Sequence, residues 1–108
     1  MSKIQEYGQK FVRHATKLQR TMQKDKRNDD VDKHIAEAAI LVCMDMVADV
    51  KKIDYKSDDE FYKALRMQEA VWKTLAEALN PQVKPFKLTG KAFRVYVNDQ
   101  MPFLRGKW

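Results

Sequence analysis

Three long stretches of the chain repeat apolar side chains at every third or fourth position, which is the spacing of one face of an α-helix. In the first stretch, residues 3–26, the repeating apolar residues are Ile4, Tyr7, Phe11, Ala15, Leu18 and Met22. This stretch contains no proline, and its single glycine lies near its start. The pattern predicts an amphipathic helix of about six turns over residues 3–26.

The second stretch, residues 31–53, is apolar around most of its circumference and contains an unbroken apolar run over residues 38–44. Asp29 or Asp30 is a suitable N-cap for it. A helix that is apolar nearly all round has to be covered on more than one side. We therefore expect 31–53 to be the central helix of a bundle or one side of an oligomer interface, for which a twofold homodimer is the commonest arrangement.

The third stretch, residues 58–79, has clear signals at both ends. Ser57 to Glu60 read Ser-Asp-Asp-Glu, which is a capping box at the start of a helix. Asn80 and Pro81 mark its end, because asparagine tolerates the left-handed conformation of many helix ends and proline cannot continue a helix. The sequence predicts a helix over 58–79.

The last part of the chain, residues 81–108, fits two structures. Phe93, Val95 and Val97 alternate with polar residues, as in a strand. The same segment also fits a helix with Thr89 as its N-cap. We favour a short fourth helix, because an isolated hairpin is marginally stable.

These patterns predict an all-α fold. Residues 1–80 would form a compact three-helix bundle, and residues 81–108 a basic, aromatic C-terminal extension packed on the same domain. A length of 108 residues suits one domain.

Charge is unevenly distributed along the chain. The net charge of +6 divides into +6 for residues 1–27, −5 for residues 28–80 and +5 for residues 81–108. Such an asymmetry is informative about partners rather than about the fold.

The first predicted helix carries a stripe of basic residues away from its apolar face. Lysines recur every seven positions from Lys3, nearly two helical turns apart, and two arginines lie beside them. A stripe of this kind suits contacts with phosphates. The candidate anion-binding residues of this helix are Lys10, Arg13, Lys17, Arg20 and Lys24.

The C-terminal extension offers a second set of candidates. Lys91 and Arg94 would add phosphate contacts, and Tyr96 and Trp108 would stack on bases. The leading hypothesis is a non-enzymatic binding module for a phosphate-rich partner, with nucleic acid as that partner. In the competing interpretation the basic stripe is an ordinary solvated helix face, paired with the acidic residues Asp29, Asp30, Asp58, Asp59 and Glu60.

Other partners fit the same basic residues. The first helix could dock on an acidic surface of a larger protein, which would make the chain an adaptor or inhibitor. A nucleotide-type ligand could bind between protomers of an oligomer. We expect no membrane binding, because the apolar face of the first helix is needed to cover the second.

No catalytic motif is evident, and we predict no catalytic residue, cofactor or metal. A helical metal-dependent hydrolase using Glu37, Asp45 and Asp49, with His14 or His34 nearby, is a less favoured alternative. Thr89-Gly90-Lys91 lacks the remaining residues of a phosphate-binding loop. Cys43, the single cysteine, lies in the most apolar run and is expected to be a packed side chain. The N-terminal residues lack the apolar segment of a secretory signal, so we expect a cytoplasmic protein.

Overall fold

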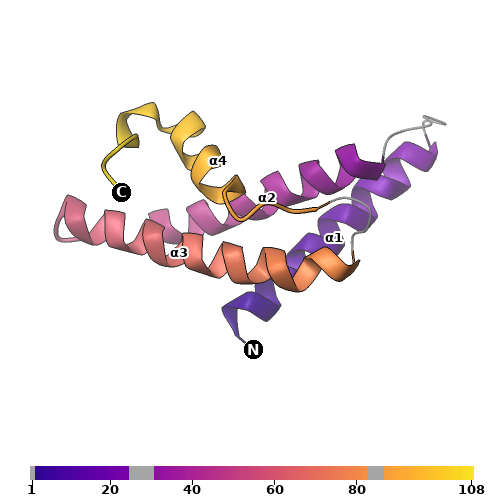
Figure 1. The fold of residues 1–108 in the computed structure, drawn as a ribbon, viewed down its shortest axis with the longest axis horizontal. Helices are drawn as coiled ribbons and strands as arrows, with labels where there is room; N and C mark the ends of the chain where they lie inside the picture. The colour runs from indigo at the N-terminus through magenta and orange to yellow at the C-terminus, as the bar shows by residue number, and fades with distance from the viewer. Residues whose placement is uncertain (1, 25–30, 83–86) are drawn as a thin grey trace.

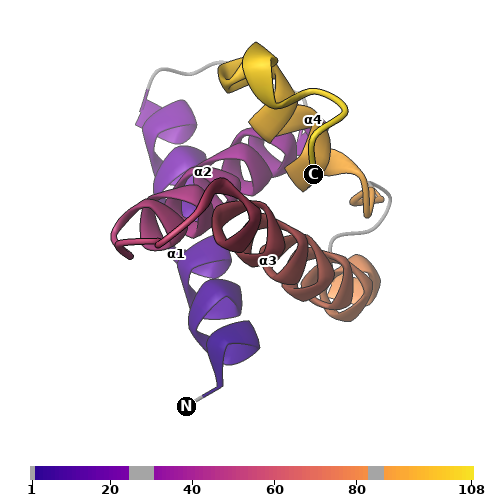
Figure 2. The same cartoon turned by 90° about the vertical axis from the view of Figure 1, so that its left-hand side faces the viewer.

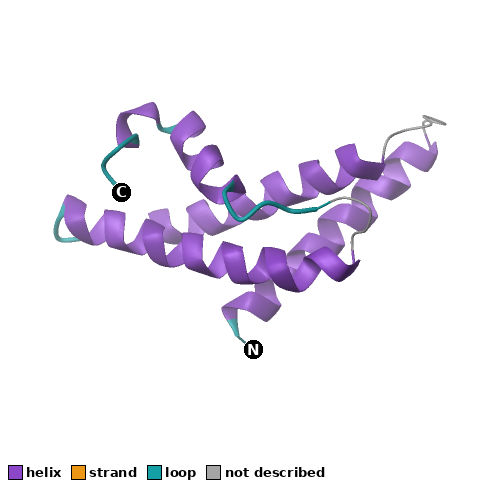
Figure 3. Ribbon diagram, viewed as in Figure 1, coloured by secondary structure: helices purple, strands orange, loops and turns teal. Residues whose placement is uncertain are grey.

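The computed structural model describes residues 2–24, 31–82 and 87–108. These residues form helices and connecting loops without any strand (Figure 3). The helices are α1 (Lys3–Lys24), α2 (Val31–Lys51), α3 (Asp58–Leu79) and α4 (Ala92–Gln100), with 3-10 turns η1 (Asn80–Gln82) and η2 (Pro102–Leu104). The predicted all-α fold with a short fourth helix is therefore confirmed.

Helix α2 is the centre of the molecule. It packs against α1, α3 and α4, whereas α1 and α4, in the part of the chain that the structure describes, do not contact each other. Figures 1 and 2 show α1 and α4 on different sides of α2. The expectation that this helix is covered on more than one side is confirmed, and Ala38, Val42 and Met46 are completely buried in it. The homodimer stays a prediction.

A continuous apolar core joins all four helices. Its largest fully buried side chains are Trp72 of α3, Tyr7 of α1 and Phe93 of α4. Burying a large apolar side chain stabilises a fold by about 1.5–3 kcal/mol, so these residues fix the positions of their helices. The indole nitrogen of Trp72 donates to the Thr89 carbonyl at 2.9 Å, which holds the segment that leads into α4.

The two ends of α3 differ in how well they match the prediction. Ser57 is the N-cap, and its hydroxyl accepts from the Glu60 backbone at 3.4 Å. The Glu60 carboxylate accepts from the backbone of Lys56, one residue before the cap, at 3.0 Å. The prediction of a left-handed conformation at Asn80 is wrong. Its φ of −52° and ψ of −42° are those of a right-handed helix, and the chain continues into η1.

Asn80 instead fastens the following loop. Its side-chain oxygen accepts from the Leu88 backbone nitrogen at 2.6 Å, and its side-chain nitrogen donates to the Leu88 carbonyl at 3.3 Å. The side chain thus occupies both backbone hydrogen-bonding groups of a residue eight positions away. Asn80 therefore holds the loop after α3 in place through its side chain, and it does not act as a left-handed helix cap.

The strand alternative for residues 93–97 is wrong. Phe93 and Val97, one helical turn apart, are buried, while Val95 between them is 55% exposed. The N-cap is Lys91 and makes no side-chain capping bond, so the predicted capping by Thr89 is also wrong. The Thr89 carbonyl accepts from the Ala92 backbone at 3.3 Å.

Helices α1 and α2 match their predicted ranges closely. Helix α2 ends at Lys51, two residues earlier than expected. The proposed caps Asp29 and Asp30, like residues 25 and 26 at the predicted end of α1, lie outside the described residues. In the part of the chain that the structure covers, no helix has the length and apolar character to cross a bilayer.

Candidate anion-binding site

The basic residues of α1 lie on the side of the helix turned away from the core. Tyr7 and Phe11, at 1% and 3% exposure, mark the buried side. At about 100° per residue, Arg13 and Arg20 lie about 160° and 180° around the helix from Phe11. We call Lys10, Arg13, Lys17 and Arg20 the α1 basic face, of which Lys10 is half-buried and the other three are exposed.

The two arginines of the α1 basic face are not neutralised by any described side chain. The carboxylates of α1 and α2 that have partners contact other residues, with Lys3 Nζ 3.6 Å from Glu6, His14 Nε2 3.1 Å from Asp45 and Lys52 Nζ 3.7 Å from Asp49. Neither Arg13 nor Arg20 makes an ion pair or hydrogen bond within residues 2–24, 31–82 and 87–108.

The acidic residues proposed to neutralise this face do not reach it in the described structure. Asp58 and Asp59 are exposed in the first turn of α3 and make no ion pair with α1. Glu60 is engaged with the Lys56 backbone. Asp29 and Asp30 lie outside the described residues.

Lys10 differs from the arginines because it lies at the edge of the helix interface. Its Nζ is 5.7 Å from the centre of the Tyr7 ring. It also faces a polar depression of about 320 Å³ that it shares with Lys3, Arg13 and Asp49. The charge of Lys10 is therefore partly compensated, and the arginines are the more available cations.

Asp49 in this depression stays ionised. Burial raises the pKa of its carboxyl, but the hydrogen bond from the Tyr7 hydroxyl and the positive charge of Lys10 outweigh it and hold the pKa below its usual range. The Tyr7 hydroxyl donates to Asp49 Oδ2 at 2.6 Å and accepts from Gln68 Nε2 at 3.0 Å. This network connects α1, α2 and α3.

The second predicted set of anion-binding residues lies elsewhere. Lys91, Arg94 and Tyr96 belong to α4 and its N-cap, and α4 makes no contact with α1. The structure therefore does not bring the two sets together. The side chain of Lys24, at the end of α1, lies outside the described residues.

Arg94 is already committed to an intramolecular partner. Its Nε and Nη2 donate to the two carboxylate oxygens of Glu69 at 2.5 and 3.1 Å. Nη2 also donates to the Trp108 carbonyl at 3.1 Å, and the guanidinium lies 3.9 Å from the centre of the Trp108 ring. The hydrogen bond from Arg94 holds the pKa of Glu69 below its usual range.

The two candidate stacking residues have little surface to offer a base. Trp108 is 8% exposed, packs edge-on against Phe93 with ring centres 6.0 Å apart, and donates from Nε1 to Asn98 at 3.0 Å. Tyr96 is half-buried against the core. Only Lys91 of the second set is an exposed cation without an ion-pair partner among the described side chains.

The residues of the hydrolase alternative are dispersed among other contacts. Asp45 pairs with His14 and Asp49 with Tyr7, while Glu37 is exposed. Among the described residues, no three or more His, Cys, Asp or Glu side chains lie close enough together to hold a metal ion. His34 is buried, and its Nε2 has no hydrogen-bond partner in that part of the chain.

Cys43 is a packed side chain, as its surroundings in the sequence suggest. It is 1% exposed, and burial raises the pKa of its thiol to about 12. The nucleophilic form of cysteine is the thiolate, which is scarce at neutral pH with such a pKa.

The contacts of Arg94 were missed by sequence reasoning because Glu69 and Trp108 lie 25 and 14 residues away from it. No helical spacing connects these positions, so no sequence pattern indicated them.

In comparisons with known proteins, no family model, no curated protein and no solved structure matches the chain.

Proposed function

We propose that the chain is a non-enzymatic binding protein whose α1 basic face contacts the phosphates of nucleic acid. The observation that carries the proposal is the position of Arg13 and Arg20, which are exposed opposite the buried face and unpaired within the described residues. Arginine donors match phosphate oxygens in geometry, and free ones favour an external anion.

The shape of α1 suits a backbone contact rather than base reading. Its 22 residues make a straight rod of about 33 Å. Arg13 and Arg20 are about 10 Å apart along this rod, so they would contact separate phosphates. Contacts of this kind fix position without selecting sequence. We therefore expect similar affinities for unrelated sequences of the same length.

A salt titration tests the proposal. Binding to a fluorescein-labelled DNA duplex and to a labelled RNA strand is measured by anisotropy between 50 and 200 mM salt. If each of the four residues of the α1 basic face contacts one phosphate of duplex DNA, a plot of the logarithm of the binding constant against the logarithm of the salt concentration should have a slope of about −3.6. The affinity would then drop on the order of 10²-fold over this range.

Charge reversal locates the contacts. Replacing both Arg13→Glu and Arg20→Glu should weaken duplex binding and reduce the slope to about −1.8, because two of four contacts are lost. The matched control is Lys63→Glu with Arg66→Glu, which changes the net charge equally through exposed residues of α3. Equal losses in both double variants, or no binding at 50 mM salt, would contradict the proposal.

An acidic protein surface is the alternative partner for the same arginines. A stoichiometric protein complex that survives nuclease treatment and is lost in the variant with Arg13→Glu and Arg20→Glu would support this partner over nucleic acid.

We also propose a cytoplasmic location, in which a single reduced cysteine such as Cys43 is ordinary.

A further inference from the structure

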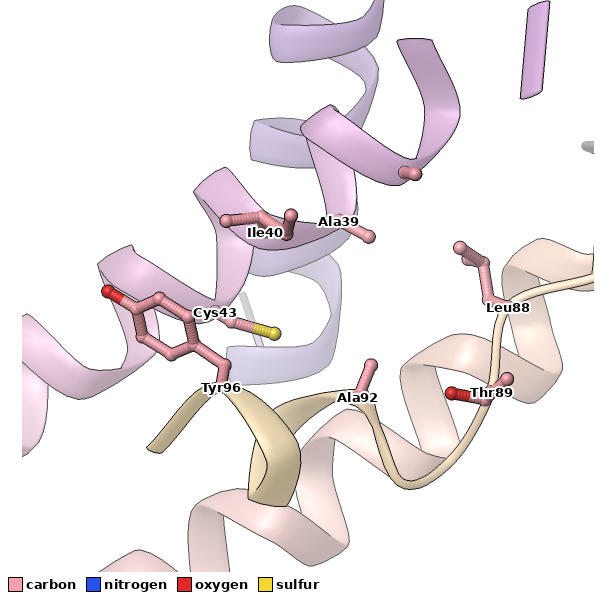
Figure 4. A pocket seen from close by; sticks show the side chains of 8 residues that line it. Ala39, Ile40, Cys43, Leu88, Thr89, Ala92 and Tyr96 are labelled. Carbon is pink, nitrogen blue, oxygen red and sulfur yellow. The ribbon is translucent and has the colours of Figure 1, made fainter. Parts of the chain in front are cut away.

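A small apolar cavity lies between α2 and the segment that enters α4. Its volume is about 170 Å³, and its lining includes Ala39, Cys43, Leu88 and Ala92. The side chains of Cys43, Leu88 and Ala92 point toward one another across this space (Figure 4). Ile40, which is 50% exposed, also lines the cavity, so the cavity opens to solvent.

The apolar surface continues beyond the cavity along α2. Ile40 and Met44, one helical turn apart, are 50% and 46% exposed. Residues four positions apart are neighbours on a helix surface, so the two side chains extend the cavity into an apolar strip. We call Ile40, Met44 and the cavity the α2–α4 groove. Contiguous exposed apolar surface of sufficient size marks interaction sites on proteins.

Lysines stand next in sequence to the lining residues on the α4 side of the groove, whereas on the α2 side the exposed Glu37 follows Ala36, which also lines the cavity. Lys87 and Lys91 are exposed and flank Leu88 and Thr89, which line the cavity. Neither lysine has an ion-pair partner among the described side chains. A partner that sets carboxylates against this edge would be complementary in charge.

The size of the cavity indicates what enters it. An engineered cavity of about 150 Å³ holds one benzene molecule, whereas pockets for drug-sized ligands have about 300–1,000 Å³. The cavity therefore fits one large apolar side chain. A helix that inserts such side chains into a groove presents them at successive turns, which matches the spacing of Ile40 and Met44.

We propose that the α2–α4 groove binds an acidic amphipathic helix of a protein partner. One large apolar side chain of that helix fills the cavity, further apolar side chains cover Ile40 and Met44, and carboxylates face Lys87 and Lys91. This site is independent of the α1 basic face, because α1 and α4 do not touch.

A displayed library of helical peptides of about 15 residues, roughly four turns, is the probe. Peptides are selected on the wild-type chain and depleted on Ile40→Lys, which puts a charge at the mouth of the groove. The enriched sequences should carry large apolar residues at helical spacing and a negative net charge. Enrichment of positively charged sequences, or no enrichment beyond that on Ile40→Lys, would overturn the proposal.

Affinities of the leading peptide, measured by anisotropy, then test each part of the groove. Ile40→Lys, and Lys87→Glu with Lys91→Glu, should each weaken binding at least tenfold. The matched controls are Met67→Lys, an apolar residue 63% exposed on α3, and Lys63→Glu with Arg66→Glu. These controls should stay within twofold of the wild type, and losses as large as those of the groove variants would overturn the proposal.

Cys43 lines the cavity, is the single cysteine of the chain and is 1% exposed, so a small thiol reagent labels it slowly, through transient opening of the groove. Bound peptide should slow the labelling of Cys43 by a small thiol reagent at least fivefold, and an unchanged rate would place the peptide elsewhere. Arg13→Glu with Arg20→Glu should leave peptide binding unchanged, which separates this test from that of nucleic-acid binding. A dimer that Ile40→Lys converts to a monomer in light scattering would assign the groove to a second copy and overturn the proposal.

Discussion

The guanidinium of Arg94 lies 3.9 Å from the centre of the Trp108 ring and donates to the carbonyl of the same residue at 3.1 Å. The contact requires the chain to reverse direction after α4. Gly106, with a φ of +77°, makes part of this reversal in a conformation that other residues rarely adopt. The reversal returns Trp108 to the core.

Removing this ring should destabilise the fold. Trp108→Ala is expected to lower the free energy of unfolding by about 3 kcal/mol, because a buried aromatic side chain is lost and a cavity remains. Urea denaturation followed by circular dichroism measures the change. Phe103→Ala is the control, since Phe103 is 67% exposed and should cost at most about 0.5 kcal/mol. Similar losses in the two variants would contradict the role assigned to Trp108.

The pair of Glu69 and Arg94 should make stability depend on pH. Because the pKa of Glu69 is held below its usual range by the Arg94 hydrogen bond, the ionised form contributes stability above the ordinary glutamate pKa of about 4.3. This contribution is lost as the pH falls through the lower pKa of the folded state. The wild type should therefore exceed Glu69→Gln in stability at pH 6 and lose this advantage below pH 4.3. A difference that stays constant down to pH 3 would count against the prediction.

Tyr7 should make the stability of the fold depend on pH under alkaline conditions. Burial, followed by the hydrogen bond to Asp49, raises the pKa of Tyr7 from 10.0 to about 12. The neutral hydroxyl thus contributes stability below pH 10, which is lost as the pH rises through about 12. Tyr7→Phe should cost about 1–2 kcal/mol at pH 8, and this cost should shrink above pH 10. Urea denaturation at pH 8 to 11 measures it, and a cost that does not change with pH would refute the assignment.

Asn80 should control the loop that precedes α4. Asn80→Ala removes both hydrogen bonds to Leu88 and is expected to cost about 1–3 kcal/mol. The exchange of the Leu88 amide hydrogen should accelerate, because its acceptor is lost. Asn80→Asp retains an acceptor and should protect this amide better than alanine does. Unchanged exchange in Asn80→Ala would show that the loop is held by other contacts.

The sequence predicts the helices well where local chemistry determines them. The limits of α3 follow from Ser57, whose side chain supplies a hydrogen bond at the start, and from Pro81, which cannot continue an α-helix. Residues 93–97 were ambiguous because Phe93, Val95 and Val97 satisfy both periodicities. Packing on α2 and α3 decides for the helix, and that packing is a tertiary property.

The candidate site was less predictable than the fold. The position of Arg13 and Arg20 on α1 follows from the helical period alone. Where Lys91, Arg94 and Trp108 lie relative to these arginines could not be predicted, because it depends on how α4 is placed around α2. The salt bridge between Arg94 and Glu69 connects two helices and leaves no periodic signal in the sequence.

The central position of α2 has a consequence for how many molecules one copy of the chain can hold. Helices α1 and α4 lie on different sides of α2 (Figure 2), and within the described residues they do not contact each other. A molecule seated on one side therefore does not obstruct the other. With both proposed partners bound, one chain would form a ternary complex that holds a partner protein helix and a nucleic acid at the same time.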